Sequence, residues 1–305
     1  MSYKVPVDDI NFNLKVMGLL EQIQALSAYE EISDDLVDAI IEENSRLVEE
    51  EIAPLNVVGD QDLPSCEQGE VSLSKGFKEA LALFAEGGWQ SLAHGPEFGG
   101  QGFPKLISTV LFENLNAANM AFALCPILTD GCIEAINQAG TEEQKQLYIP
   151  PMVEGRWTGT MNLTEPQAGS DLALLKSRAV RQDDGSYRIS GQKIFITWGE
   201  HNASENIIHL VLARTPDAPA GVKGISLFVV PKFLVNEDGS LGKRNDVVCA
   251  SLEHKLGIHG SPTAVMVFGD NQGEVGEGAI GYLIGEENDG LRHMFVMMNE
   301  ARFAI

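Results

Sequence analysis

The stretch "MNLTEPQAGSD" (Met161–Asp171) marks the place where the hydrophobic pattern of this chain changes from helical to alternating. The segments that follow it, "SYRISGQKIFITW", "NIIHLVLART", "GISLFVVPKFL" and "TAVMVF", are rich in β-branched and aromatic residues. Turn signals such as Asp184-Gly185 and Asp238-Gly239 separate these segments. This alternation predicts a compact antiparallel β domain.

The sequence before this stretch has helical spacing. The segment "SDDLVDAIIEENSRLVEEEIAP" repeats apolar residues near a period of 3.6, with Ser33 as a candidate N-cap and Pro54 as its end. Further helices are predicted in "SKGFKEALALFAEGG", in "PKLISTVLFENLNAANMAFAL", which opens with Pro104, and in "TEEQKQLYIPP", which opens with the capping-box pair Thr141 and Gln144. Residues 1–157 are therefore predicted to be all-helical.

The last segment, "GLRHMFVMMNEARFAI" from Gly290, returns to a helical pattern and is expected to continue beyond Ile305. The chain is thus expected to be α+β. Its 305 residues are enough for two domains, each with a core of its own.

The charge balance argues against nucleic-acid and membrane partners. Lys plus Arg is 21 against 44 for Asp plus Glu, a net charge of -23, so a basic patch for a phosphate backbone or an anionic membrane is not expected. The longest apolar run, Met120 to Leu128, is shorter than the roughly 20 residues of a membrane span. The four cysteines form no CxxC pair and the first residues lack a signal-peptide pattern, which predicts a reduced, cytoplasmic protein.

Common catalytic motifs are weak or absent in this sequence. "GEGAIG" (Gly276–Gly281) matches the dinucleotide pattern G-x-G-x-x-G, but a strand-like segment follows it, where a βαβ unit would need a helix. The six histidines have no zinc-ligand spacing, so no metal site is expected. No P-loop and no G-x-S-x-G elbow is present.

Two polar segments are candidates for a cofactor site. In the first, Met161–Asp171, Pro166 fixes φ, Gly169 permits a positive φ, and Thr164 and Ser170 offer hydroxyls, which suits a phosphate or a heteroaromatic edge. The alternative is an ordinary capped β-turn. In the second, "GQKIFITWG", Phe195 and Thr197 could face a planar ring; the alternative is a half-buried strand with Ile194 and Ile196 on its other face.

Together these segments resemble a known family. "MNLTEPQAGSD" with "GSYRISGQKIFITWG" is similar to the flavin-binding signature of acyl-CoA dehydrogenases, T-E-P-x-A-G-S-D followed by G-x-K-x-[FW]-I-T-x-G. "GPEFGGQGFP", "GTEEQKQLYIPPMVEGRWTG" and "IGEENDGLRHMFVMMNEAR" also match, so the resemblance extends from about Gly95 onward. The first ninety residues look most like the enlarged branch that includes methylmercaptopropionyl-CoA dehydrogenases.

This resemblance implies a helical N-terminal domain (1–157), an antiparallel β-barrel domain that binds flavin (158–285) and the first helix of a C-terminal helical bundle (286–305), with FAD between barrel and bundle. It differs from many members at Met161, where an aromatic residue is common, and at Gln167, where Gly is common. The implied flavin contacts are Met161, Leu163, Thr164, Gly169, Ser170, Phe195, Ile196 and Thr197, and the implied substrate contacts are Ser170, Asn299 and Arg302.

The implied reaction removes a proton from Cα of an acyl-CoA thioester while a hydride leaves Cβ for the flavin. The catalytic base is expected beyond Ile305. Glu300 is a candidate, but the glutamate of members that carry a base on this helix falls opposite Ala301, about 100° away on the helix. The expected partners are acyl-CoA, an electron-transfer flavoprotein and a second copy of the chain. A flavin-dependent oxidase or monooxygenase and a non-catalytic binding module are the alternatives.

Overall fold

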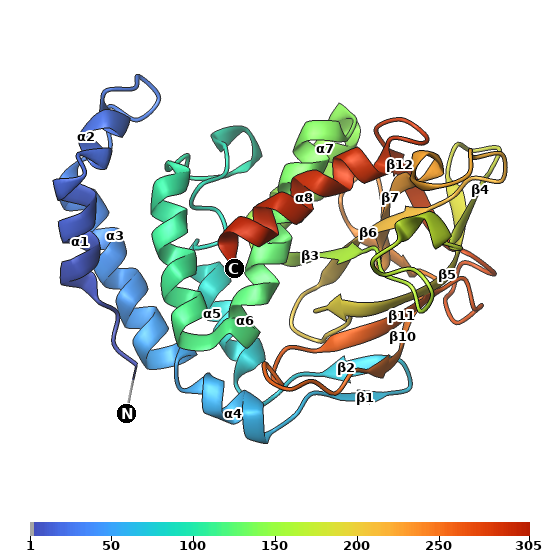
Figure 1. Ribbon diagram of the computed structural model, residues 1–305, viewed down its shortest axis with the longest axis horizontal. Coiled ribbons are helices and arrows are strands. Elements are labelled where there is room, and N and C mark those ends of the chain that lie inside the picture. The colour runs from blue at the N-terminus through green and yellow to red at the C-terminus, as the bar shows by residue number, and fades with distance from the viewer. Residues whose placement is uncertain (1–2) are drawn as a thin grey trace.

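The computed structural model describes residues 3–305 and places a helical N-terminal region beside a β-sheet domain (Figure 1). A final helix, α8 (Gly290–Ala304), returns from the sheet domain to lie against the helical region. The helical region consists of α1 (Val7–Val16), α2 (Leu19–Gln24), α3 (Asp34–Leu47), the π-helical turn η1 (Val48–Ile52), α4 (Leu55–Gln61), α5 (Phe77–Glu86), the 3-10 turn η2 (Pro96–Phe98), α6 (Lys105–Ala139) and α7 (Glu142–Val153).

The predicted helix starts are confirmed by their caps. The Leu36 backbone N–H donates to the Ser33 hydroxyl over 3.2 Å, which starts α3. At α7 the Gln144 N–H donates to Thr141 Oγ1, and the Thr141 N–H donates to Gln144 Oε1, so the capping box is complete. The helical backbone that begins at α3 runs through η1 and ends before Pro54, which precedes α4.

The prediction that residues 1–157 are all-helical was wrong, because a short hairpin lies within them. Strands β1 (Ser65–Glu67) and β2 (Glu70–Ser72) pair through a turn in which Gln68 and Gly69 both have positive φ. A Cβ on Gly69 would lie 2.3 Å from the Val248 side chain, so glycine also permits the hairpin to pack on the sheet domain. Three-residue strands are too short to give a periodic sequence pattern.

The sheet domain is built on an eight-stranded sheet in the order β10-β11-β5-β12-β7-β6-β3, with β4 paired to β5. Its strands are β3 (Trp157–Asn162), β4 (Arg178–Arg181), β5 (Tyr187–Thr197), β6 (Asn206–Ala213), β7 (Ser226–Pro231), β10 (Val247–Leu252), β11 (Thr263–Phe268) and β12 (Ala279–Ile284), and β8 (Phe233–Val235) pairs with β9 (Leu241–Arg244) beside it. Two 3-10 turns, η3 (Leu172–Leu174) and η4 (Val222–Gly224), lie in its loops.

Two features of this sheet differ from the predicted antiparallel barrel. The sheet is not closed, because β10 and β3 at its two ends do not pair with each other within residues 3–305. The end strands are instead covered, β10 by the β1–β2 hairpin and β3 by α6. The strand pair β3–β6 is also parallel, with Trp157 opposite Asn206, whereas the other pairs in the sheet are antiparallel. Strand patterns in a sequence do not reveal this order or direction.

Helix α6 is the centre of the helical region. Non-helical backbone at Asn119 (φ −160°, ψ 87°) divides it into two segments. Its length and composition also suit a membrane span, but 89% of its most apolar 18-residue window is buried inside the protein. It packs against α7, β3 and α8, so its apolar surface serves the core.

One hydrophobic core joins the helical region to the sheet domain. Buried residues of α3, α5, α6 and α7 belong to the same cluster as buried residues of β3, β6, β7 and α8. Trp198, just after β5, lies in this shared core: its ring is 6.4 Å from that of Phe77, and its indole N–H donates to the Ala121 carbonyl over 3.0 Å. A second cluster fills the interior of the sheet domain.

Candidate flavin and substrate site

A cavity of about 600 Å³ lies where the loop after β3, the end of β5, helix α6 and helix α8 meet. All eight residues predicted to contact a cofactor line it, although they come from two segments of the sequence. The structure therefore brings the two candidate segments together. The lining residues are Leu124, Leu128, Met161, Leu163, Thr164, Gly169, Ser170, Leu172, Phe195, Ile196, Thr197, Phe295, Met298, Ala301, Arg302 and Ile305.

The loop after β3 is held in shape by its own backbone. Glu165 and Ala168 exchange two N–H···O=C hydrogen bonds of 3.0 Å each, which closes a tight turn over Pro166 and Gln167. Asp171 then accepts a hydrogen bond from the Ala173 N–H and caps η3. The turn thus directs Gly169 and Ser170 back toward the cavity.

The expected positive φ of Gly169 is not observed. The φ angle of Gly169 is not positive, and a Cβ at this position would contact only the Thr164 methyl group, at 3.6 Å. The backbone at this position is therefore one that other residues can adopt. What glycine provides here is an uncovered backbone at the wall of the cavity.

The end of β5 also departs from the predicted alternation. In the ladder with β11, Ala264 pairs with Ile196 but Met266 pairs with Lys193, so one extra residue is inserted on β5 as a β-bulge. Phe195 lies in this bulge with φ of +60° and is 57% exposed. A bulky residue in the left-handed region at a cavity wall is the kind of backbone strain that is typical of functional sites. The bulge lets three consecutive residues line one cavity, which a regular strand cannot do.

Helix α8 contributes the opposite wall. Phe295, Met298, Ala301 and Arg302 follow the spacing of one helix face, and the Arg302 guanidinium lies 5.9 Å from the centre of the Phe295 ring. Asn299, which was predicted to contact substrate, is exposed and does not line the cavity.

The Glu300 carboxylate points away from the cavity. It accepts a hydrogen bond from Lys105 Nζ over 2.8 Å on another side of α8, whereas the neighbouring Ala301 lines the cavity. This is the orientation that the helical rotation between the two positions predicts. Among residues 3–305, no Asp, Glu or His lines the cavity, so these residues offer it no general base.

Several lining residues were not identified from the sequence. Leu124 and Leu128 are one helical turn apart in the apolar run of α6, and Phe295 and Met298 precede Arg302 at helical spacing. Their periodicity was visible in the sequence, but it predicts core packing equally well. Only the tertiary packing of α6 and α8 shows that these faces border a cavity.

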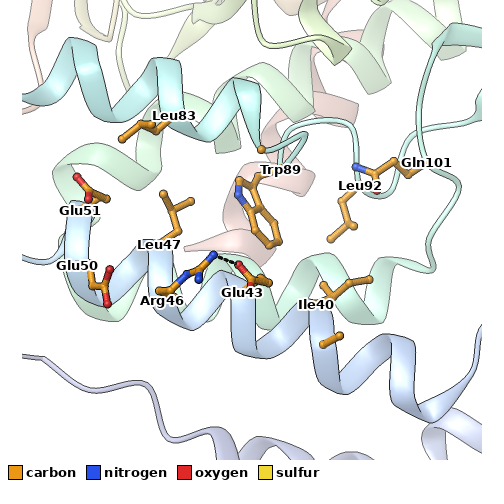
Figure 2. A pocket seen from close by; sticks show the side chains of 12 residues that line it. Ile40, Glu43, Arg46, Leu47, Glu50, Glu51, Leu83, Trp89, Leu92 and Gln101 are labelled. Atoms are coloured by element: carbon orange, nitrogen blue, oxygen red, sulfur yellow. Dashed lines mark hydrogen bonds and ion pairs between the residues drawn. The ribbon is translucent and has the colours of Figure 1, made fainter.

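A second cavity of about 550 Å³ lies between α3, α5 and the loop after α5. Figure 2 shows the Trp89 ring between Leu47 and Leu92, with the Glu43–Arg46 ion pair at the rim. No described histidine, cysteine, serine or threonine lines it. The lining residues described therefore offer no hydroxyl, thiol or imidazole group, and none of them belongs to the two candidate cofactor segments.

Comparisons with known proteins agree with the sequence resemblance. Residues 36–156 match the N-terminal domain of acyl-CoA dehydrogenases, and residues 160–271 match the middle domain of the same family. The chain is 53% identical over 305 residues to 3-methylmercaptopropionyl-CoA dehydrogenase of Ruegeria pomeroyi, covering 100% of this chain and 50% of that protein. It is 36% identical over 308 residues to the broad-specificity linear acyl-CoA dehydrogenase FadE5 of Mycobacterium tuberculosis, covering 99% and 49%.

Solved structures show the same fold. Butyryl-CoA dehydrogenase of Megasphaera elsdenii superimposes with a TM-score of 0.68 at 26% identity, covering 88% of this chain and 63% of that one. A structure described as the electron-transferring flavoprotein of Acidaminococcus fermentans also gives 0.68 at 26% identity, covering 89% and 63%. The chain spans about half the length of the curated relatives it matches. These matches, with the cavity that joins both signature segments, show that the chain belongs to the acyl-CoA dehydrogenase family and carries its N-terminal and middle domains.

Proposed function

We propose that this protein binds FAD in the cavity between the sheet domain and α8 and takes part in the α,β-dehydrogenation of an acyl-CoA thioester to an enoyl-CoA. The observation that carries the proposal is that both signature segments, 161–170 and 195–197, line one cavity together with α8. The names of the relatives, which include dehydrogenases of 3-methylmercaptopropionyl-CoA and of linear acyl-CoA, support this reaction class.

The residues of the cavity suit a flavin. A planar ring system with polar edges needs apolar walls and a few hydrogen-bonding groups at its rim. Met161, Leu163, Phe195 and Ile196 supply apolar walls from two sides of the cavity, since they come from the β3 loop and from the end of β5. Thr164, Ser170 and Thr197 supply hydroxyls that both donate and accept.

We assign roles to these residues accordingly. Bound FAD would supply the acceptor for the hydride that leaves Cβ of the substrate. Thr164 and Thr197 would hydrogen-bond the edges of the flavin ring. Gly169 and Ser170 would lie at its phosphates, and Ser170 would also reach the CoA arm. Arg302 would hold an anionic or carbonyl group of the substrate, because it is the one cation among the lining residues described.

The proton from Cα requires a base that the described lining residues do not provide. Glu165 is buried and bound within its loop, and Glu300 pairs with Lys105 outside the cavity. We propose that a carboxylate outside residues 3–305 acts as the base, or that the chain described here binds flavin without turning over substrate.

We further propose that an electron-transferring flavoprotein accepts the electrons. We also propose that the protein is a homodimer and is located in the cytoplasm.

The proposal is tested by adding FAD to the purified protein and following the flavin absorbance, fluorescence and stoichiometry. A panel of acyl-CoA thioesters is then added without oxygen. Bleaching of the bound flavin, with an enoyl-CoA as product, supports a dehydrogenase. Reoxidation by an electron-transferring flavoprotein, and only slowly by air, distinguishes it from an oxidase. No flavin binding under any condition would refute the proposal.

A further inference from the structure

A buried ion pair lies directly behind the cavity, between the β3 loop and β5. Lys193 on β5 is 0% exposed and Glu165 in the loop is 3% exposed, and Lys193 Nζ is 2.8 Å from Glu165 Oε1. A buried charge is costly to remove from water unless it is paired and hydrogen-bonded, so a pair in this position needs many compensating contacts. The contacts of the two side chains show where the compensation comes from.

The Glu165 carboxylate is a centre for hydrogen bonds of its own loop. Oε2 accepts from the Lys176 backbone N–H over 2.7 Å and from Gln167 Nε2 over 2.6 Å, and Oε1 accepts from the Ser177 backbone N–H over 3.0 Å. Gln167 lies near the start of the segment 166–175, and Lys176 and Ser177 directly follow its end. The carboxylate therefore joins the start and the end of the loop that carries Gly169 and Ser170.

The Lys193 ammonium makes the matching contact on the other side. Besides Glu165 it donates to the Leu163 carbonyl over 3.0 Å, and the next residue, Ile194, donates its backbone N–H to the Thr164 carbonyl over 2.9 Å. Two consecutive residues of β5 thus bind the backbone carbonyls of Leu163 and Thr164, two residues that line the cavity. Only one residue, Ile194, separates Lys193 from Phe195 in the bulged, cavity-lining end of its own strand.

The charge state of the pair agrees with this arrangement. Burial alone would raise the pKa of Glu165, but the Lys193 charge and the hydrogen bonds to Lys193, Ser177 and Lys176 lower it overall, to about 2. Burial lowers the pKa of Lys193 to about 8, against the opposing effect of Glu165. At neutral pH both groups are therefore charged, and Glu165 cannot serve as a proton acceptor for substrate.

We propose that Lys193 and Glu165 are positioning residues for the flavin: their ion pair fixes the spacing between the loop 163–170 and the strand end 195–197, so that the two walls of the cavity are set before the cofactor binds. The inference rests on the proposed function, because it assigns the cavity to FAD. It predicts that loss of the pair raises the Kd for FAD, beyond any fall in the thermal midpoint of the protein.

The same domain contains a matched control. Lys232 forms an ion pair with Glu200, and these residues are 6% and 0% exposed, so this pair is about as buried as the first. Neither residue lines the cavity. Lys193→Met leaves Glu165 buried without its cation, and Lys232→Met removes one of the two cations that contact Glu200, the other being Arg244. Both variants are therefore expected to destabilise the fold. Only Lys193→Met also removes a hydrogen bond to the backbone of a cavity-lining residue, the one to the Leu163 carbonyl.

The experiment compares these two variants with the wild-type protein in three measurements: the thermal midpoint without FAD, the Kd for FAD with the absorbance spectrum of the bound flavin, and hydrogen exchange of peptides that cover residues 161–171. We expect Lys193→Met to raise the Kd by about tenfold or more, the effect of losing one charged hydrogen bond. We also expect it to shift the flavin spectrum and to speed exchange in 161–171. Lys232→Met lowers the thermal midpoint but leaves the Kd within about twofold.

Two further variants keep the test decisive. Lys193→Arg retains the cation and is expected to recover part of the FAD affinity. If Lys193→Met does not fold, Glu165→Gln retains the shape of the carboxylate without its charge, and it replaces that variant in every comparison.

Equal Kd values for Lys193→Met and Lys232→Met, or unchanged exchange in 161–171, would overturn the inference. If the wild-type protein does not bind FAD, the proposed function fails, and the exchange comparison alone then decides whether the pair positions the loop.

Discussion

The close approach of α6 and α8 permits a sharp prediction for Gly131. This residue lies in the buried part of α6, opposite Met297 of α8. A Cβ at position 131 would be 2.9 Å from Met297 Cγ and 3.1 Å from the Met297 carbonyl oxygen. The side chain of Met297 can move, but its carbonyl cannot move unless α8 does. Gly131→Ala should therefore push α8 away from α6.

Two opposing effects set the size of the change. Alanine in place of glycine in a helix stabilises by up to about 1 kcal/mol. Overpacking a core by one methyl group costs about 1–3 kcal/mol. Because the second contact is to backbone, we expect the cost to exceed the gain, with a net loss of about 1–2 kcal/mol in the free energy of unfolding. For a chain of this size each kcal/mol lowers the thermal midpoint by about 1–2 °C.

The assay is thermal and denaturant unfolding of Gly131→Ala beside the wild-type protein, with FAD affinity measured in parallel. Affinity should fall as well, since α8 carries one wall of the cavity. Gly257→Ala is the control: it has no heavy atom within 4 Å of the added Cβ and an ordinary φ, so its stability should stay equal or rise slightly. A Gly131→Ala protein as stable as the Gly257→Ala control would refute the reasoning.

Four further predictions concern single side chains. Thr197→Val should raise the Kd for FAD about fivefold and shift its reduction potential, because one neutral hydrogen bond is lost; an unchanged potential would contradict the proposed contact. Arg302→Ala should weaken the binding of acyl-CoA to the FAD-loaded protein about tenfold, with Arg302→Lys between the two, as a binding titration would show. Glu300→Gln should leave flavin reduction by acyl-CoA unchanged, because this carboxylate bonds Lys105 outside the cavity; a lost reduction rate would make it the base. Burial alone would lower the pKa of His94, but Asp130 raises it overall. The stability that this pair contributes is therefore full below pH 6.5 and is lost as pH rises through the raised pKa. When the unfolding of His94→Gln is measured across pH, its loss of stability relative to the wild-type protein should be largest at the acid end.

Much of the fold could be predicted because local sequence and tertiary structure agree. The caps at Ser33 and Thr141 are made by neighbouring residues, so the sequence alone contains them. The open sheet, the parallel β3–β6 pair and the β1–β2 hairpin depend on contacts between residues far apart in the chain. A period of two gives the existence of strands but neither their order nor their direction.

The candidate site, like the fold, could be predicted only in part from the sequence. The eight residues predicted to contact a cofactor were selected because the two signature segments resemble a family, and the structure brings all eight to one cavity. The alternative interpretation of the Phe195 segment, a regularly alternating strand, was wrong, since the strand has a bulge that depends on pairing with β11. Asn299 was placed by its motif position, but the rotation of α8 turns it to solvent. Which face of a helix borders a cavity is decided by packing partners that the sequence does not reveal.

The core shared by the helical region and the sheet domain has a consequence for how such a chain can change in evolution. Trp198 directly follows a strand of the sheet domain, yet its ring lies against Phe77 and its N–H donates to the Ala121 carbonyl, both from the helical region. A gene rearrangement that transferred the sheet domain alone would uncover this apolar surface and leave the indole without its acceptor. Recombination is therefore constrained to move the two regions together, as one heritable block. The solvent-facing residues of α1 and α2, at the edge of the molecule, can diverge with little effect on it (Figure 1).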